Sequence, residues 1–187
     1  MFYEEILEGR YVDLISATVK DVEFTWNIRR DPNFAIFFPK FDNTLEQQKA
    51  WICSQRNEPG DYFFVIWDKE GNRIGVIGLY NIKKDECEAG RIAVRGNAFQ
   101  SIEAQMLSFT FAFDILNVDK TISYIYADNE RALRFSKLFG GNFDEPRVYK
   151  YGERPMIRKV TKKEQFYDTL EKIKKMIYRD ERGNYHV

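Results

Sequence analysis

Residues 86–116, ECEAGRIAVRGNAFQSIEAQMLSFTFAFDIL, decide the fold of this chain. Their first part, Glu86–Val94, is predicted to be a strand that completes a meander. From about Ser101 to Leu116, apolar side chains form one helical stripe and also occupy most other sides of the helix. A helix that is apolar on most sides is buried, so we expect it to pack against a sheet.

The flanking sequence predicts further strands and helices around this helix. Thr18 is the expected N-cap of a helix that runs through Arg30 and ends at Pro32, and Gly140-Gly141 is a helix C-terminal signal. In chain order we expect a strand at 11–15, a helix at 18–30, a helix capped by Asn43 or Thr44, a hairpin of strands at 62–67 and 73–80, a strand at 121–126, a short helix around 132–139, strands at 147–151 and 155–160, and a helix at 162–178. This order predicts an α+β domain.

Length and composition predict a single domain over residues 1–187, in which residues 162–187 form a C-terminal helix and tail. The 29 Lys and Arg balance 29 Asp and Glu, so no basic excess supports nucleic-acid binding. No apolar stretch approaches the length of a membrane span, and no membrane partner is expected. Acidic residues near the N-terminus stand where a signal peptide carries bases, so a cytoplasmic protein is expected.

The cysteines and the histidine limit the chemistry that this chain can perform. Cys53 and Cys87 form neither a zinc motif nor a disulfide framework, and both are expected to be reduced and at least partly buried. His186 is the one histidine of the chain. These facts argue against Ser-His-Asp and Cys-His hydrolases and against a histidine-rich metal site. No metal is expected.

The stretch Asn129-Glu-Arg-Ala-Leu-Arg-Phe-Ser-Lys-Leu-Phe-Gly140 resembles the signature N-x-x-A-x-x-hydrophobic-Y-x-x-x-G of the GNAT acyltransferases. Residues 9–14 and 61–79 are similar to the branch of ribosomal-protein alanine acetyltransferases. The resemblance covers about residues 8–160. It implies a GNAT fold, with a mostly antiparallel mixed sheet, a splayed pair of parallel strands, and helices on both faces. It also implies N-acetyl transfer from acetyl-CoA, which would bind between the splayed strands around 89–94 and 121–126.

The resemblance further implies which residues hold acetyl-CoA. Main-chain groups of the first splayed strand would bind the pantetheine arm, and the loop and helix start that follow would bind the pyrophosphate. A helix N-terminus favours anions on physical grounds as well. The implied residues are Ile92, Ala93, Val94, Arg95, Gly96, Asn97, Ala98, Phe99, Gln100 and Ser101.

This loop departs from the family pattern, because it contains one glycine, and Phe99 and Ser101 stand where glycines are usual. A GNAT fold that has lost its cofactor is therefore an alternative. Asn129 is expected either to bond the cofactor arm or to cap the following helix.

Direct acetylation of an amine requires a base. An alkyl ammonium has a pKa near 10, so its deprotonation at pH 7 costs about 4 kcal/mol. Glu88 lies two residues from Glu86 on one face of the expected strand and is the first choice for this base, with an exposed strand-end acid as the alternative. A main-chain N–H near 92–94 is expected to stabilise the oxyanion. Ser136 holds the position at which many GNAT enzymes have a tyrosine as general acid. Because serine is a poor acid, the thiolate is expected either to leave unaided or to take its proton from another hydroxyl, for which Tyr126 is preferred over its neighbour Tyr124.

In GNAT proteins the first two helices and the loop between them usually form the acceptor side, so the resemblance implies that the amine binds near residues 26–39, which contain aromatic residues and an arginine pair. The opening W-x-x-R-x-x-P at residues 26–32 is similar to that of amino-sugar N-acetyltransferases and of the ribosomal-protein acetyltransferase relatives. Arg29, Arg30 and Phe38 would contact a nucleotide-linked amino sugar, which is slightly favoured as the small-molecule amine substrate. A protein N-terminus (a peptide substrate), a polyamine, or a non-catalytic acyl-CoA-binding role remain as alternatives. A homodimer through the apolar face of the last helix also remains open.

Overall fold

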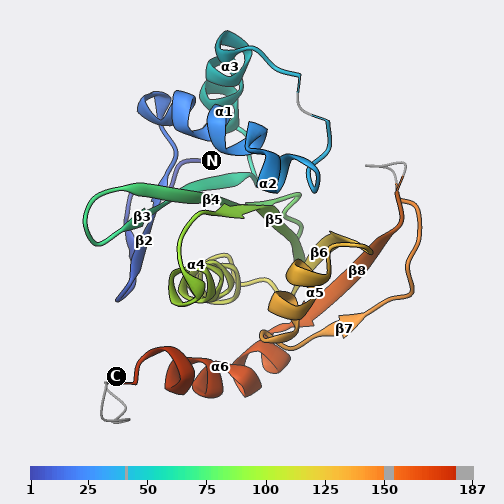
Figure 1. Cartoon of the computed structure of the whole chain (residues 1–187). Helices are drawn as coiled ribbons and strands as arrows, with labels where there is room; N and C mark the ends of the chain where they lie inside the picture. Colours follow the sequence, from blue (N-terminus) through green and yellow to red (C-terminus); the bar gives the residue numbers. More distant parts are fainter. Residues whose placement is uncertain (41, 150–153, 180–187) are drawn as a thin grey trace.

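The computed structural model describes residues 1–40, 42–149 and 154–179, and it shows one mixed sheet with helices on both faces (Figure 1). Neighbouring strands follow the order β1-β2-β3-β4-β5-β6-β8-β7. All neighbours run antiparallel except β5 and β6, which run parallel. The strands are β1 Leu7–Glu8, β2 Val12–Ser16, β3 Tyr62–Asp68, β4 Arg73–Tyr80, β5 Glu86–Val94, β6 Lys120–Tyr126, β7 Asn142–Phe143 and β8 Met156–Lys162.

The helices form a layer on each face of the sheet. The short 3-10 turn η1 (Val19–Asp21), α1 (Val22–Arg30), α2 (Pro32–Ala35) and α3 (Leu45–Gln55) lie on the upper face in Figure 1. On the lower face lie α4 (Ala98–Thr110), its π-helical continuation η2 (Phe111–Ile115), α5 (Glu130–Lys137) and α6 (Lys163–Ile177). Each layer has its own apolar core. The larger one contains side chains of α4, η2 and α6, and the smaller one contains Ile28 of α1 and lies against Trp51 of α3.

The sequence predicted this layout, but several boundaries differ. Helix α4 begins at Ala98, three positions before the expected start at Ser101, because Asn97 and Gln100 form a reciprocal capping box. Helix α1 ends at Arg30, before Pro32, as expected. Pro32 also begins the short helix α2, where a missing N–H costs no hydrogen bond.

One expected strand is wrong in its described part. Within residues 147–149 only Arg147 forms a bridge, to Met156. The strand that covers the outer edge of β8, opposite β6, is the shorter β7. Residues 150 and 151 of the expected strand lie outside the described residues.

Helix α6 packs within its own chain. Phe166, Leu170, Ile173 and Ile177 all belong to the larger core, so this apolar face is covered without a second copy. The tail from residue 180 onward, including His186, lies outside the described residues. In the ranges that the structure describes, no helix combines the length and apolar character needed to cross a bilayer.

A fully buried carboxylate joins three parts of the fold. Glu103 of α4 is 0% exposed and accepts hydrogen bonds from the backbone N–H groups of Arg10 (2.8 Å), Tyr11 (2.6 Å) and Val12 (2.8 Å). Its Oε1 atom also accepts from the hydroxyl of Tyr178, at 2.6 Å, just after α6. The carboxylate thus satisfies backbone donors at the β1–β2 turn and ties both chain ends to the central helix.

We expect Glu103→Ala to lower the free energy of unfolding by about 3 kcal/mol or more, since several donors at this site lose their acceptor. Urea unfolding would measure the loss. Glu23→Ala, which removes an exposed carboxylate from α1, should change stability by no more than about 0.5 kcal/mol. Equal effects of the two substitutions would contradict the role of Glu103.

Candidate active site

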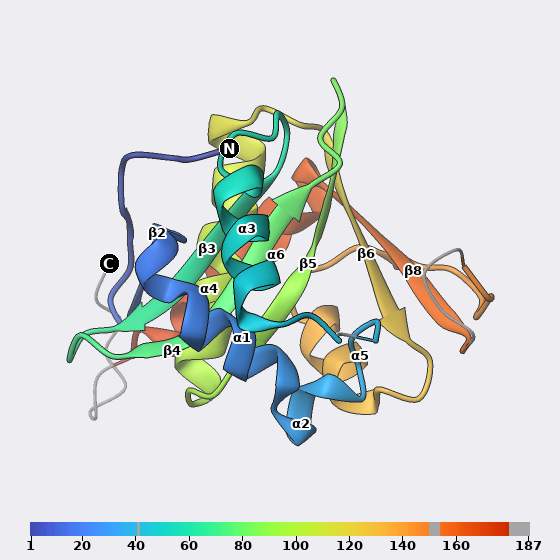
Figure 2. The same ribbon diagram turned by 90° about the horizontal axis from the view of Figure 1, so that it is seen from above.

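The two parallel strands of the sheet separate part-way along their length. Pairing between β5 and β6 covers Glu86↔Lys120, Cys87↔Thr121 and Glu88↔Ile122, and the register includes no later pair. At the point of separation the hydroxyl of Ser123 donates to the carbonyl of Ala89, at 2.9 Å. Figure 2 shows β5 and β6 diverging beyond this point, with α5 at the open end. The expected splay is confirmed, and it leaves one edge of β5 without a strand partner over residues 89–94.

A β-bulge reverses the faces of β5 within this open part. Val76 pairs with Ala93 and Gly78 pairs with Gly90, so one residue of β4 opposes two of β5. Arg91 occupies the bulge with φ of 54°. As a result Ile92 packs against the larger core, whereas Ala93 belongs to the smaller core, beside α1. Together with Val94, these are the residues expected to bind the pantetheine arm through their main chain.

The expected pyrophosphate site lies where β5 turns into α4. The side chain of Asn97 accepts from the N–H of Gln100, at 3.0 Å, and the N–H groups of Ala98 and Phe99 at the helix start have no intrahelical partner. A Cβ at Gly96 would lie 2.5 Å from Oε1 of Gln100, so a larger residue there would displace the Gln100 side chain from its bond to the N–H of Asn97. The guanidinium of Arg95 donates to the carboxylate of Asp31 at 3.0 Å, and the hydroxyl of Ser101 donates to the carbonyl of Asn97 at 2.9 Å.

Phe99 does not fill the divergence between the strands. Its ring stacks on Tyr11 at 5.8 Å between centroids, and the residue is 45% exposed. The side chain therefore points toward β2, and the chain replaces a family glycine there without closing the open edge of β5.

Helix α5 carries two of the predicted residues. Asn129 caps it, with Oδ1 accepting from the N–H of Ala132 at 3.1 Å, which is the capping role that was expected as one alternative. Ser136 lies half-buried in its last turn. The carbonyl of Ser136 accepts from the ammonium of Lys159 at 2.7 Å, so β8 holds the end of the helix.

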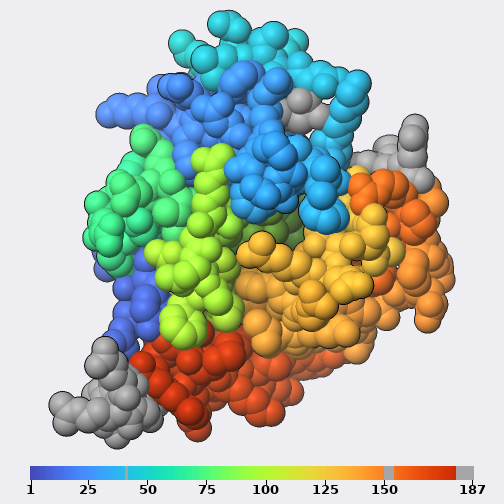
Figure 3. Space-filling view, in the orientation of Figure 1, coloured from blue at the N-terminus to red at the C-terminus, as the bar shows by residue number. Residues whose placement is uncertain are grey.

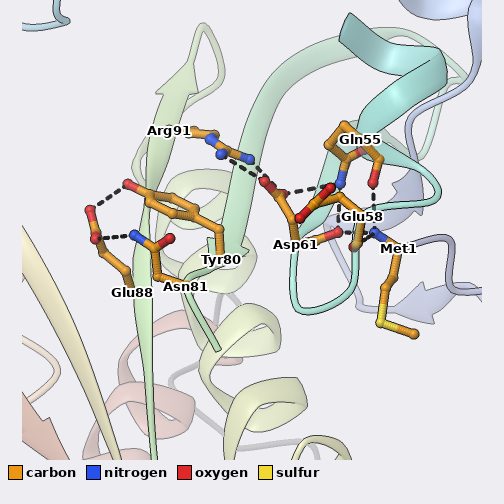
Figure 4. A network of polar contacts seen from close by, with 8 residues as sticks. All are labelled: Met1, Gln55, Glu58, Asp61, Tyr80, Asn81, Glu88 and Arg91. Carbon is orange, nitrogen blue, oxygen red and sulfur yellow. Dashed lines mark hydrogen bonds and ion pairs between the residues drawn. The ribbon is translucent and has the colours of Figure 1, made fainter. Parts of the chain in front are cut away.

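Glu88 is held by two donors from the end of β4 (Figure 4). The hydroxyl of Tyr80 donates to its Oε1 at 2.8 Å, and the amide of Asn81 donates to its Oε2 at 2.9 Å. Glu88 makes no ion pair with any described residue. The guanidinium of Arg91 lies 4.0 Å from the Tyr80 ring and forms a two-pronged ion pair with Asp61, at 2.6 and 2.8 Å.

Sequence reasoning found Glu88 but missed its partners Tyr80 and Asn81. The signal was available in the hairpin, because Tyr80 and Glu88 are directly opposed in the antiparallel register.

Figure 4 also shows the far side of Asp61, where the amino group of Met1 donates to the carbonyls of Gln55 (2.8 Å), Glu58 (3.0 Å) and Asp61.

Two tyrosines of β6 share the face of Glu88. Glu88 and Ile122 are paired in the parallel register, so Tyr124 and Tyr126 lie on the same face two and four residues further on. Burial raises the pKa of Tyr124, and the charge of Glu88 adds to this. Tyr126 is 7% exposed, with the guanidinium of Arg154 4.5 Å above its ring. Ser136 lies on α5, across the sheet from these tyrosines, so the structure does not bring it together with Glu88.

Arg154 bridges the acceptor-side helices and the end of β6. It donates to the carbonyl of Ile36 at 2.7 Å and pairs with the carboxylate of Asp128. Figure 3 shows a hollow in the surface between the blue atoms of α2 and the amber atoms of α5, with green strand atoms at its bottom. Sequence reasoning did not predict the hydrogen bond from Arg154 to Ile36, because these residues are 118 positions apart.

The two expected substrate arginines point to different places. Arg29 stacks on Phe38 at 5.2 Å and is mostly buried; burial lowers the pKa of its guanidinium, and the positive charge of Arg91 adds to this. Arg30 is exposed and lies 4.5 Å from the ring of Trp26, whose indole N–H donates to the carbonyl of Asn43. The structure therefore brings Arg29 and Phe38 toward the network of Tyr80 and Arg91, and leaves Arg30 on the outer side of α1.

The cysteines lie apart from this network. Cys87 is buried, and burial raises the pKa of its thiol to about 12, so it is not a nucleophile. Cys53 is exposed on α3, so the expectation that it is partly buried is wrong.

Comparison with protein families decides what this arrangement is. Residues 12–142 match the family model described as "Acetyltransferase (GNAT) domain". The chain belongs to the GNAT acetyltransferase family. It is an acyl-CoA N-acyltransferase, and members of this family use acetyl-CoA. The acetyltransferase PseH of Campylobacter jejuni (subsp. jejuni serotype O:2, strain ATCC 700819 / NCTC 11168) is 26% identical over 147 residues, which cover 75% of this chain and 88% of that protein.

Solved structures show the same fold. A GCN5-related N-acetyltransferase from Brucella melitensis superposes with a TM-score of 0.79 at 18% identity, covering 98% of this chain and 91% of that one. Apo FdhC, a nucleotide-linked sugar GNAT, gives 0.76 at 16% identity, covering 92% and 97%. The spermidine N-acetyltransferase of Vibrio cholerae in complex with CoA and spermine gives 0.78 at 15% identity, covering 85% and 99%.

The buried Lys159 behind this GNAT site makes the stability of the protein depend on pH. Burial lowers its pKa from 10.5 to about 7. Between these values the unfolded chain binds a proton that the folded chain has lost, so the folded state is stabilised as pH rises from 7 toward 10.5. At and below pH 7 both states are increasingly charged, and folding bears the cost of the buried ammonium.

We therefore expect Lys159→Met to be more stable than the parent protein at pH 6–7, with an advantage that shrinks as pH rises from 7 to 10. Urea unfolding at pH 6, 7, 8 and 9 would measure it. Lys137→Met, which removes an exposed lysine of α5, should show a difference that does not vary with pH in this way. A constant difference for Lys159→Met would contradict the argument.

Proposed function

We propose that this GNAT enzyme acetylates the primary amine of a nucleotide-linked amino sugar, with Glu88 as the general base. The observation that carries the proposal is the character of the acceptor face around Glu88. Guanidinium groups and aromatic rings line it. Its other carboxylates are paired with cations: Asp61, Asp128 and Asp144 with arginines, and Glu86 with Lys83 and Lys120. One structural relative, apo FdhC, is a nucleotide-linked sugar GNAT, which is consistent with this choice.

The ion pairs separate this substrate from a polyamine. Asp61 is paired with Arg91 at 2.6 Å, Asp144 with Arg158 at 3.2 Å, and Asp128 with Arg154. A polycationic substrate would need carboxylates that are not already neutralised in this way. An anionic substrate is favoured instead, because a phosphate near Arg29 and Arg91 would offset the repulsion that contributes to the lowered pKa of Arg29.

The residues around the open edge of β5 fit acetyl-CoA. The main chain of residues 92–94 has no strand partner on the side of β6, and the N–H groups at the start of α4 suit a pyrophosphate. When bound, acetyl-CoA supplies an acetyl thioester. Main-chain N–H groups of β5 are placed to stabilise negative charge on the thioester oxygen.

The proposed step is direct transfer. The amine nitrogen of the acceptor forms a bond to the acetyl carbon, the bond from that carbon to sulfur breaks, and CoA leaves as the thiolate. Glu88 accepts the proton that the amine loses. The thiolate takes up one proton, from Tyr126 or from water, since a thiolate is a modest base that leaves without strong assistance. The products are the N-acetylated sugar nucleotide and CoA thiol.

A thiol-release assay with acetyl-CoA tests the function over a panel of amino-sugar nucleotides, polyamines and peptides. We expect turnover with an amino-sugar nucleotide. Turnover confined to a polyamine or a peptide would select those alternatives, and silence with every amine, together with binding of CoA in calorimetry, would select a non-catalytic role. For Glu88→Gln we expect kcat at pH 7 to fall about 10²- to 10⁴-fold. An unchanged rate would exclude Glu88 as the base.

The two neighbouring arginines provide a matched pair for the acceptor. We expect Arg29→Gln to raise KM for the sugar nucleotide roughly 10- to 100-fold, because a charge-assisted hydrogen bond to a phosphate is lost. Arg30→Gln, on the outer side of α1, should change KM less than about threefold. Steady-state kinetics on both variants measures this, and similar KM values for the two would contradict an anion site at Arg29.

A further inference from the structure

We propose that Tyr80 is a positioning residue for Glu88, and that Gly90 is a glycine so that the Tyr80 hydroxyl can cross β5 and reach the carboxylate. The inference rests on the proposed role of Glu88 as the base. It deepens that role, because it states how a side chain on a strand at the edge of an open site is held in one orientation.

The contact geometry holds the carboxylate at both oxygens. Tyr80 and Glu88 are opposed in the antiparallel register, and the phenol donates to Oε1 at 2.8 Å. Asn81 follows in a left-handed conformation, with φ of 52°, and donates to Oε2 at 2.9 Å. Asparagine tolerates this conformation better than most residues. Two of about four lone-pair positions are thus occupied, which leaves others to accept a proton.

Gly90 lies directly under the phenol. A Cβ atom built on Gly90 would be 2.6 Å from the hydroxyl oxygen of Tyr80, but 3.4 and 3.5 Å from the ring atoms Cζ and Cε1. The backbone of Gly90 is not in the left-handed region, so an alanine is compatible with its conformation. The glycine is therefore required for space, and the group that requires the space is the hydroxyl.

The ring of Tyr80 is fixed from its other side. The guanidinium of Arg91 lies 4.0 Å from the ring centroid and is itself held by Asp61. The bulge at Arg91 is what turns this side chain onto the acceptor face. The ionisable groups around Glu88 include Tyr80 from β4, and Glu86, Cys87 and Arg91 from β5. Lys120, which pairs with Glu86, and Tyr124 come from β6, and Arg29 of α1 acts through Arg91 and Tyr80.

The test compares Tyr80→Phe, Gly90→Ala and the double variant with the parent protein. We expect each single variant to lower kcat at pH 7 roughly 10- to 100-fold, with KM for both substrates little changed, because a hydrogen bond to a charged group is lost. The double variant should be no slower than Tyr80→Phe, because removing the hydroxyl removes the clash with the new methyl group.

A pH series distinguishes positioning of the base from general damage. As pH rises toward the pKa of the amine, the substrate arrives neutral and needs the base less. The deficits of Tyr80→Phe and Gly90→Ala should therefore shrink with rising pH, as should that of Glu88→Gln. The control is Tyr167→Phe. This variant removes a phenol of α6 that donates to Asp114 at 2.7 Å, away from Glu88, and it should keep the parent rate.

The outcomes separate the two claims. If Glu88→Gln is slow but Tyr80→Phe and Gly90→Ala turn over like the parent, the inference is overturned and the proposed function stands. Additive losses in the double variant, or deficits that do not vary with pH, also overturn it. If the parent protein is silent with every amine, the proposed function and the inference fail together. A crystal structure of Gly90→Ala gives a readout without turnover, and a Tyr80 hydroxyl still bonded to Glu88 would overturn the role of Gly90.

Discussion

The separation of β5 from β6 after Glu88 and Ile122 is the constraint on which the rest of the site depends. Up to that pair the two strands satisfy each other's backbone groups, and beyond it one edge of β5 is left for a ligand. The same point places Glu88 at the apex of the opening, and the turn after Val94 places the start of α4 at the other end of the open edge of β5. One change in strand pairing therefore creates an open strand edge with a carboxylate at one end and a helix N-terminus at the other.

The bulge at Arg91 gives the two halves of β5 different partners. Without the extra residue, the period of two would place Arg91 on the face of Cys87 and Ala89, in the larger core. With it, Arg91 reaches Asp61 and the ring of Tyr80 on the acceptor face, while Ile92 and Val94 return to the core. The bulge places the non-glycine residue Arg91 at positive φ, which strains the backbone. The ion pair with Asp61 and the packing on both sides offset this strain.

Hydrogen bonds from two buried polar side chains hold the elements on the opposite face of the sheet. Glu103 gathers backbone N–H groups of the β1–β2 turn and the Tyr178 hydroxyl, and Lys159 donates to the carbonyl end of α5. Both side chains are almost inaccessible to solvent. They hold α4 and α5, the helices beside the open edge of β5, through hydrogen bonds that are remote from the acceptor.

Local patterns in the sequence determined the order of most strands and helices and the buried character of α4, and they offered Asn129 as a possible cap and Glu88 as a candidate base. Periodicity, caps and turns act between residues that are near in the chain, which is why they can be predicted. The start of α4 was misplaced by three residues, since a reciprocal cap at Asn97 outweighed the apolar pattern. Only the tertiary structure decided that Arg29 and not Arg30 faces Arg91, that Phe99 stacks on Tyr11, and that the Tyr80 hydroxyl passes over Gly90 to Glu88. Each of these depends on which strands pair and where a bulge reverses a face, and those contacts between distant segments are selected by packing of the whole sheet.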